Sequence, residues 1–557
     1  MKHAKQFIVM MVMLTIAVAP WSQSHAQTAA KPAAIISLSS IDELVGDAKH
    51  VVAAVGIPGV DDQLTAMLDP FTAGIDRSRA IGAVVALGGD LGFTVKAFIP
   101  VKNFNQTIQL VEAQLGPAKD AGNGIKEFNG PVNIFVKEQD GWAHISQGVE
   151  GLASLPKDPL KLLGGLDKSY DFAVRANIQA IPALFRNMLI SQMKAGVEAT
   201  LERQPGESDE TYEVRRKAVQ NQVKQMEKLV NEVEELTIGW NYDQKGAGTY
   251  FDMGITPVKG SSLGKGFAVM ADLKSDFVGF QSADAAIRMN VTSKVLPEEA
   301  EETKVMLNGL RQQALTELDN DNSIPPNVQQ MLKEVLSDVL DVGSETLEAG
   351  TIDGGMAVFL RDGSVQVGGG FHVVGGKKLE SAVKKIIKLA QEEDEFPEEV
   401  QVRFDTEVYK GISFHTISIP VPPQEEARQI FGEELQIALG TSDGSIYFGV
   451  ASNSVSFLKG VIDKNGSAGR KDVRPMEMSM ALLPILEFAA SIEGADNPIV
   501  NAMIRQLKTA SGKDHVSLSV TMEKETSSAL YRFQLEEGII KAIGAGVQAG
   551  IAGGLGF

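Results

Sequence analysis

The chain runs through a similar order of elements twice, from about residue 80 to 256 and again from about 354 to 537. In the first pass, the β-rich stretches 81–88 and 91–99 lead into an amphipathic helix over 102–115. In the second pass, stretches 355–361 and 364–374 lead into a helix over 377–391. An internal duplication constrains the fold strongly, because one architecture then accounts for most of the chain.

Hairpin-sized gaps between the predicted strands indicate antiparallel pairing, with helices packed on one face of each sheet. A strand over 170–177 shows the expected alternation, with apolar Phe172, Val174 and Ala176 set against polar Asp171, Arg175 and Asn177. The predicted fold class is therefore α+β, built as two tandem related units. The first unit covers 27–275 and includes a helical insertion near 195–235, and the second covers 276–541.

Residues 1–26 have the pattern of a secretory signal peptide. Lys2 and Lys5 precede an apolar run over 7–19, and Ser24-His25-Ala26 provides a small-x-small cleavage site. The apolar run is shorter than the ~20 residues needed to span a bilayer. We therefore expect export, to the periplasm, the cell surface or the medium.

The amino-acid composition argues against several kinds of binding partner and of site chemistry. The chain has no Cys, which excludes disulfides, thiolate metal sites and Cys nucleophiles. It carries 71 Asp and Glu against 52 Lys and Arg, whereas a nucleic-acid-binding protein would present a basic face. A nucleic-acid partner is therefore not expected.

The segment Gly440-Thr441-Ser442-Asp443-Gly444 matches the G-x-S-x-G pattern of a nucleophile elbow. That chemistry places Ser on a strand-to-helix turn, but the residues that follow, 446–450, predict a second strand. A hairpin turn of small and polar residues explains every residue of the motif, so the sequence favours the hairpin. If the chain is a hydrolase, Ser442, His415 and Asp443 are the first candidates for its site.

The remaining motifs provide no metal or cofactor site. No H-E-x-x-H motif or i,i+4 His pair is present. The Gly-rich segment 368–377 departs from the spacing of a phosphate-binding loop, and Asp319 to Ser323 departs from the calcium-loop pattern at Ile324. We predict neither a metal nor a cofactor.

The C-terminal residues 542–557 form a Gly-rich apolar tail, with Gly546, Gly550 and Gly554 at four-residue steps. Glycine disfavours an isolated helix by about 1 kcal/mol each relative to Ala. The sequence favours a short helix that frays into a flexible tail contributing little to the fold. The alternative is a contact with the envelope or a membrane surface through this tail.

Two stretches resemble a family of uncharacterised exported proteins from planctomycete-type bacteria. They are the run that begins Met270-Ala-Asp-Leu-Lys-Ser-Asp-Phe and the ending Leu530-Tyr-Arg-Phe-Gln-Leu-Glu-Glu-Gly-Ile-Ile. The resemblance covers most of the mature chain and implies an envelope or secreted location. It supplies no activity and no site residues.

The sequence therefore favours a non-enzymatic exported protein that binds or scaffolds in the cell envelope. One alternative is a carrier of an apolar ligand such as a lipid, held where the strands at 368–370 and 83–89 are rich in small residues. The other is a hydrolase assembled from scattered residues. Neither composition nor motifs set the oligomeric state.

Overall fold

The computed structural model describes residues 31–56, 60–87, 93–203, 207, 209–246, 248–321, 323–361, 364–392, 396–423, 427–493 and 497–553. The predicted signal peptide, the junction of the β-rich stretches 81–88 and 91–99, and the last residues of the Gly-rich tail lie outside these ranges. The chain divides into two compact units. Unit 1 comprises the residues up to 196 with 224–259 and 534–544, and unit 2 comprises 197–223, 260–533 and the residues from 545.

The strands of unit 1 form one antiparallel sheet, in the order β4–β5–β6–β7–β3–β2–β1–β8–β9–β10. Their bounds are β1 (Ala34–Leu38), β2 (Ile81–Leu87), β3 (Phe93–Pro100), β4 (Lys119–Asp120), β5 (Ile125–Phe128), β6 (Ile134–Gln139), β7 (Trp142–Ser146), β8 (Phe172–Asn177), β9 (Val233–Asp243) and β10 (Gly248–Pro257).

Helices and short 3-10 turns pack on both faces of this sheet. The longer ones are α2 (Ile41–Val55), α3 (Val60–Leu68), α4 (Phe104–Leu115) and α6 (Ala183–Glu198). The shorter ones are η1 (Asp69–Phe71), η2 (Val149–Leu152), η3 (Pro159–Leu163), α5 (Leu166–Ser169) and η4 (Ile178–Ala180). Ser40 caps α2 by accepting a hydrogen bond from the backbone N–H of Glu43 at 3.1 Å, and Ser is one of the residues favoured at this position.

Two buried clusters of unit 1 lie on opposite faces of its sheet. Leu163 of η3 and Leu166 of α5 pack with Phe98 and Trp142 on one face. On the other face, Ile108 of α4 packs with Phe128, Val136 and Ala143. Strand alternation separates the two clusters, because successive side chains point to opposite faces.

The strands of unit 2 also form an antiparallel sheet, in the order β15–β16–β17–β18–β14–β13–β12–β20–β21. Their bounds are β12 (Ile287–Lys294), β13 (Thr351–Arg361), β14 (Ser364–His372), β15 (Gln401–Tyr409), β16 (Ile412–Pro420), β17 (Glu434–Thr441), β18 (Ser445–Ala451), β20 (Met476–Ala481) and β21 (His515–Glu523). A separate pair joins β11 (Leu273–Ser275) to β19 (Lys471–Val473).

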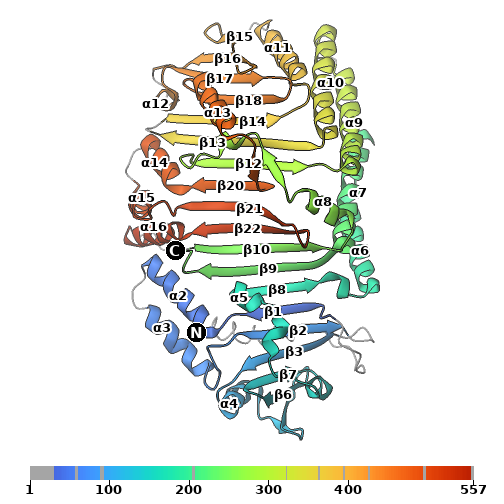
Figure 1. The fold of residues 1–557 in the computed structure, drawn as a ribbon, viewed down its shortest axis with the longest axis vertical. Helices are drawn as coiled ribbons and strands as arrows, with labels where there is room; N and C mark the ends of the chain where they lie inside the picture. The colour runs from blue at the N-terminus through green and yellow to red at the C-terminus, as the bar shows by residue number, and fades with distance from the viewer. Residues whose placement is uncertain are drawn as a thin grey trace. The chain divides into compact units, whose positions relative to one another are not determined.

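The helices of unit 2 include a long antiparallel pair, α9 (Pro297–Asn320) and α10 (Pro326–Glu348), beside the ends of the strands (Figure 1). The others are α8 (Ser262–Val269), η6 (Val278–Phe280), α11 (Gly376–Glu392), α12 (Ala427–Phe431), α13 (Ser454–Ala468), α14 (Leu482–Glu493), α15 (Pro498–Lys508) and η5 (Ala199–Leu201). Strand β22 (Ser528–Glu536) and helices α7 (Asp209–Glu232) and α16 (Glu537–Ala552) have residues in both units.

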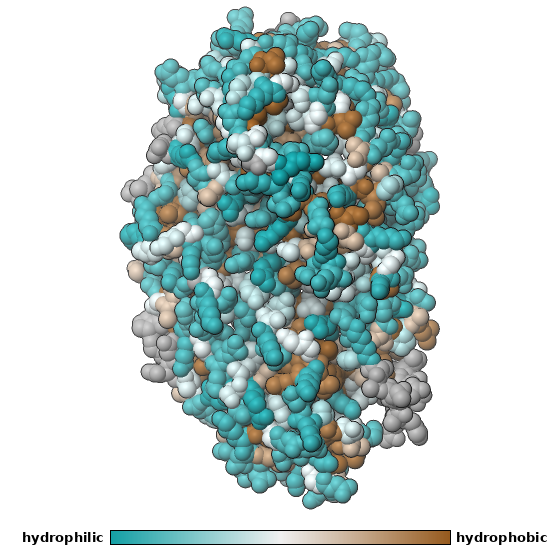
Figure 2. Space-filling view, viewed as in Figure 1, coloured by the Kyte–Doolittle hydropathy of each residue, from teal (hydrophilic) through white to brown (hydrophobic). Residues whose placement is uncertain are grey.

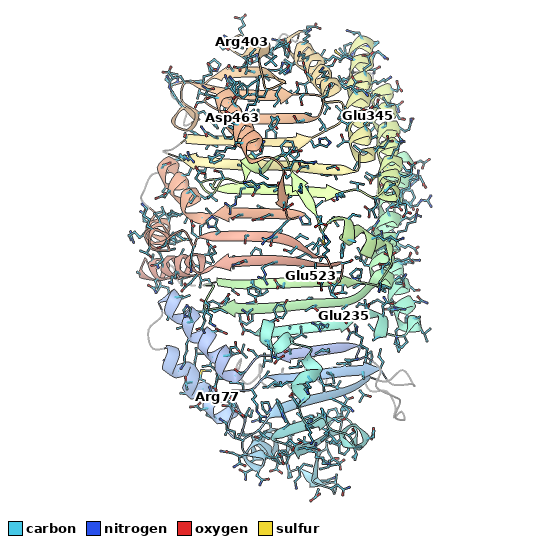
Figure 3. The ribbon with its side chains drawn as sticks, in the orientation of Figure 1. Arg77, Glu235, Glu345, Arg403, Asp463 and Glu523 are labelled. Atoms are coloured by element: carbon cyan, nitrogen blue, oxygen red, sulfur yellow. The ribbon has the colours of Figure 1, made fainter. Side chains whose placement is uncertain are left out.

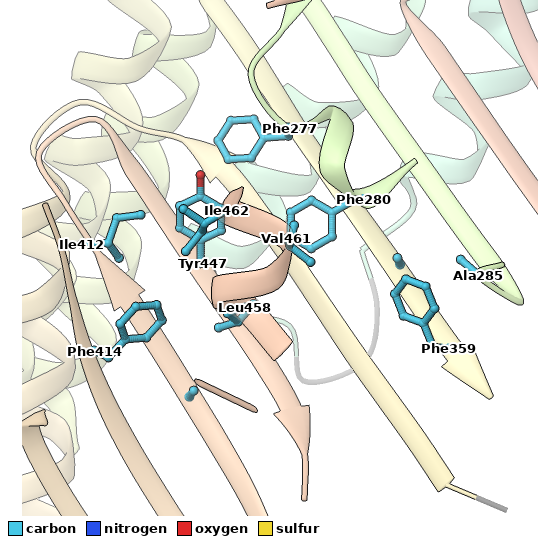
Figure 4. Close-up of a cluster of buried hydrophobic side chains, with 12 residues drawn as sticks. Phe277, Phe280, Ala285, Phe359, Ile412, Phe414, Tyr447, Leu458, Val461 and Ile462 are labelled. Carbon is cyan, nitrogen blue, oxygen red and sulfur yellow. The ribbon is translucent and has the colours of Figure 1, made fainter. Parts of the chain in front are cut away.

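The main core of unit 2 lies between its sheet and α13 (Figure 4). Leu458, Val461 and Ile462 of α13 pack on Phe414 and Tyr447 of the sheet, and Phe277 and Phe280 from the η6 segment close this cluster. Asp463 of α13 accepts hydrogen bonds from the Tyr409 hydroxyl at 2.8 Å and from Lys410 at 2.6 Å (Figure 3).

The expected α+β class with antiparallel strand pairing is confirmed. None of the helices in the described ranges combines the length and apolar character that a membrane span requires. The visible surface is largely hydrophilic, with hydrophobic side chains gathered in separate patches (Figure 2).

Candidate functional site

The G-x-S-x-G segment forms the tight turn between β17 and β18. Ser442 Oγ lies 2.8 Å from Ser445 Oγ and accepts a hydrogen bond from the Ser445 backbone N–H at 3.0 Å. Oδ2 of Asp443 lies 3.8 Å from Nζ of Lys377. The backbone carbonyl of Asp443 accepts hydrogen bonds from the backbone N–H groups of Gly375 and Gly376. A strand follows Ser442 where an elbow would have a helix, so the hairpin interpretation accounts for these contacts.

His415 lies on β16 under α11, within a polar cluster and not beside Ser442. Its Nδ1 accepts a 3.0 Å hydrogen bond from the backbone N–H of Asp405, and its Nε2 lies 3.5 Å from both Thr441 Oγ1 and Glu380 Oε1. Lys384 of α11 bridges Glu380 and Asp405, at 2.7 Å and 2.9 Å. Burial, reinforced by the charge of Lys384, lowers the pKa of His415 and keeps the ring neutral.

The tautomer of His415 determines whether the cluster can bind a metal or act as a base. A neutral imidazole has one N–H, so an Nδ1 that accepts a hydrogen bond leaves the proton on Nε2. Nε2 therefore has no lone pair with which to bind a metal or to take a proton from Thr441. His415, Glu380 and Asp405 are close enough together to resemble a metal site. However, the ring nitrogen that faces Glu380 is a hydrogen-bond donor, and the Lys384 ammonium already neutralises the two carboxylates that a metal ion would bind. We therefore interpret the cluster as a set of contacts that hold α11 on the sheet.

The most distinctive surface of unit 1 is an apolar face of its sheet, which we call the open face. Its members come from four adjacent strands and share one side because directly paired residues of an antiparallel sheet point the same way. They are Ile36, Leu38, Phe172, Val174, Ile238, Trp240, Phe251 and Met253.

Several large side chains of the open face are accessible to solvent. The exposed fractions are 54% for Ile238, 49% for Phe251, and 40% for both Phe172 and Met253. On the opposite side of β8, Ala173 is fully buried under the η3 and α5 segments. The predicted alternation of β8 is therefore present, but its apolar side is the accessible one.

Helices border the open face. At one end, the ring of His50 on α2 packs on Tyr242, which lies on the same side of β9 as Ile238 and Trp240. At another border, Phe185 of α6 contacts Phe93 of β3, with ring centroids 6.4 Å apart. These two contacts mark edges of the open face at α2 and at α6.

Unit 2 has an apolar face of different composition, which we call the methionine face. Met289 of β12 stands opposite both Met356 of β13 and Met478 of β20, and Met476 and Met480 lie on the same side of β20. Methionine is flexible and polarisable, and it packs against apolar groups of varied shape.

The Gly-rich strand β14 does not leave space for a ligand. A Cβ at Gly369 would lie 2.3 Å from the ring of Phe448, and one at Gly370 would lie 2.8 Å from the ring of Tyr447. Phe371 in turn covers Gly354 and stacks on Phe448, with a centroid separation of 6.3 Å. At residues 368–370, one of the two stretches that the sequence suggested for an apolar ligand, the chain's own aromatic rings occupy the space.

Sequence reasoning missed the open face, although its signal is present in the strands. The members on β8, β9 and β10 are apolar at alternate positions, yet both sides of these strands carry apolar residues. The alternation of residues along a strand does not by itself indicate which side of the strand a helix covers. Comparisons with protein-family models, with curated proteins and with solved structures gave no match.

Proposed function

We propose that the chain is an exported, non-enzymatic binding protein that holds an apolar molecule, such as a lipid, on the open face of unit 1. The observation that supports this proposal is the gathering of Phe172, Ile238, Phe251 and Met253 on one side of adjacent strands, each at least 40% exposed. Exposed apolar patches of this kind mark interaction sites in soluble proteins. Export rests on the N-terminal sequence pattern.

An elongated apolar molecule suits this surface better than a reaction substrate does. The members of the open face supply no nucleophile, acid or base, and its one polar side-chain group, the indole N–H of Trp240, already donates to Thr249 at 2.8 Å. Recognition would therefore depend on buried apolar area, at roughly 25 cal/mol per Å².

We also propose that the two units are related by an internal duplication. Taken position by position, the order β4–β5–β6–β7–β3–β2–β1–β8–β9 matches the order β15–β16–β17–β18–β14–β13–β12–β20–β21. The helix pairs α2–α3 and α9–α10 each follow the corresponding strand, β1 or β12. In this correspondence Ile36 matches Met289, so the open face and the methionine face occupy equivalent positions.

A fluorescence titration with N-phenyl-1-naphthylamine, an uncharged apolar probe, tests the binding proposal. We expect saturable enhancement with the mature wild-type protein and at least tenfold weaker binding for the double variant Ile238→Gln, Phe251→Gln. An exposed Ile or Phe side chain that becomes buried under the probe contributes about 1.5–3 kcal/mol to the binding free energy, and replacement by Gln removes this contribution.

Val408→Gln is the matched control, since Val408 is 68% exposed but lies on β15 in unit 2. Binding that survives the double variant, or that weakens equally in the control, contradicts the assignment to the open face. Native mass spectrometry of protein purified from its own host would identify a retained lipid by mass.

A further inference from the structure

Two carboxyl groups meet in the interior of unit 1, where α2 borders the open face. Asp47 of α2 is 4% exposed, and Asp171, immediately before β8, is 1% exposed. Asp171 accepts a 2.6 Å hydrogen bond from the Tyr242 backbone N–H through Oδ2, and one from the Ser39 hydroxyl through Oδ1 at 3.3 Å. Asp47 accepts a 2.7 Å hydrogen bond from the Gln244 side chain through Oδ1.

The second oxygen of Asp47 has no hydrogen-bond partner among the described residues, although it is buried and its carboxyl lies within hydrogen-bond reach of Asp171. Two ionised carboxylates can only accept, so neither satisfies the other. A proton on Asp47 would make Oδ2 a donor to Asp171, and the unsatisfied atom would then have a partner. Burial and the charge of Asp171, opposed by the hydrogen bond from Gln244, raise the pKa of Asp47 to about 6.

We propose that Asp47 and Asp171 share one proton, and that this proton latches α2 onto the border of the open face. When the proton leaves, two buried like charges face each other without a donor between them, which disfavours the docked helix. The border of the open face then loosens. The biological meaning of this latch, control of access for an apolar ligand, rests on the proposed function.

The neighbouring ionisable groups do not replace the proton. Glu43, also on α2, is acidic, and burial followed by the charge of Asp171 raises its pKa as well. His50 of α2 lies 3.1 Å from Glu537, and Lys541 lies 3.0 Å from the same carboxylate. Both of these groups are thus directed at Glu537, and Arg77 lies 3.0 Å from Asp42 in the first turn of α2. The Tyr242 hydroxyl near Asp47 is neutral below a pKa of about 12.

Hydrogen exchange of the α2 amides tests the latch in the whole mature protein. After correction for the intrinsic exchange rate, we expect protection of α2 to fall about tenfold from pH 5.0 to pH 7.5. A folded pKa of about 6 lies about one unit above pH 5.0, and each unit corresponds to a factor of about ten in protection. Asp47→Asn, whose amide donates to Asp171 at every pH, should give constant protection.

Asp120→Asn is the control, because Asp120 is an exposed residue of β4 in the same unit and should follow the wild type. Wild-type protection that does not change with pH, or an Asp47→Asn variant that follows the wild type, would overturn the latch. If Asp47→Asn does not fold, infrared titration of the wild type decides. A protonated carboxyl band that disappears near pH 6 supports the shared proton, and the absence of such a band refutes it.

A separate measurement tests whether the latch controls access of an apolar ligand to the open face. Stopped-flow binding of N-phenyl-1-naphthylamine should be at least fivefold faster at pH 7.5 than at pH 5.0, and independent of pH in Asp47→Asn. Equal wild-type rates at both pH values overturn the access role. If the probe fails to bind at either pH while α2 exchange follows the prediction, the latch stands and the proposed ligand function fails.

Discussion

The backbone N–H of Asp405 donates a 3.0 Å hydrogen bond to Nδ1 of His415, and this contact fixes the protonation of the ring. The donor reaches the ring because Asp405, at φ +51°, lies in an irregular stretch of β15 where the pairing with β16 shifts between Arg403 and Glu407. A bulge often redirects one group of a strand toward a neighbouring site. Here the bulge turns a backbone donor toward the sheet histidine, which makes His415 a structural residue.

His415 should make the protein less stable as the pH falls. Its folded pKa is lowered below the ordinary value near 6.5, so the unfolded chain takes up the proton first. The stability contributed by neutral His415 is therefore present above pH 6.5 and is lost as the pH falls through the folded pKa. His415→Gln, which retains an acceptor, should lack this dependence in urea denaturation at pH 5.0 and 7.5.

Asp47 changes the pH dependence of the free energy of unfolding in the opposite direction. The effect of each residue therefore has to be read from the difference between the wild-type and variant stability curves. Its raised pKa favours the folded state at low pH, and this contribution is lost as the pH rises from about 4 to about 6. Subtracting the variant curve from the wild-type curve isolates each residue. A His415→Gln difference curve that is flat, or that slopes like that of Asp47→Asn, would contradict the lowered pKa of His415.

Gly355 should not tolerate a side chain. A Cβ there would lie 2.9 Å from the Phe277 backbone oxygen and 3.1 Å from Phe280 Cβ, both in the main core of unit 2. Gly355→Ala should lower the free energy of unfolding by about 1–3 kcal/mol, the usual effect of overpacking. Gly444→Ala, where nothing lies within 4 Å, should be nearly neutral, and equal effects of the two variants in urea melts would contradict the packing argument.

Arg79 should not be replaceable by Lys. Its guanidinium donates to Asp76 at 2.9 Å and to the Gly141 carbonyl at 2.7 Å, and it lies 4.4 Å above the ring of Trp142. A Lys ammonium is a point charge that cannot make these contacts together. We expect Arg79→Lys to destabilise unit 1 by about 1–2 kcal/mol, since hydrogen bonds to charged groups contribute about that much.

The control for Arg79 is Arg403→Lys. Arg403 lies on β15, with a 2.7 Å hydrogen bond to the exposed side chain of Gln401 (Figure 3). This substitution should change the midpoint of thermal unfolding very little. A loss as large as that of Arg79→Lys would mean that loss of the guanidinium alone, and not its contacts, determines the effect.

Local features of the fold could be predicted from the sequence because they depend on neighbouring residues. The amphipathic stretch at 102–115 predicted α4, which spans Phe104–Leu115. Contacts between distant residues could not be predicted in this way. Nothing local to Asp47 indicates that it meets Asp171, and the alternation in β8 does not reveal that η3 and α5 cover the side of Ala173.

The C-terminal tail shows why composition misled the prediction. The sequence suggested that residues 542–557 contribute little to the fold, but α16 extends to Ala552, and Ala542 is fully buried. A Cβ at Gly544 would lie 2.5 Å from Val55 Cα, at the C-terminal end of α2. That expectation was wrong because glycine here permits close contact between helices, and its low helix propensity is outweighed by packing.

Substitution of Gly544 should therefore be destabilising. Gly544→Ala places a methyl group against the α2 backbone, and we expect a loss of about 1–3 kcal/mol. Gly196→Ala in α6, with nothing within 4 Å, is the matched control and should stabilise the protein by about 0.5–1 kcal/mol through helix propensity alone. Truncation after Lys541 should lower Tm, and a Tm unchanged in both the truncated chain and Gly544→Ala would show that α16 does not hold α2 in place.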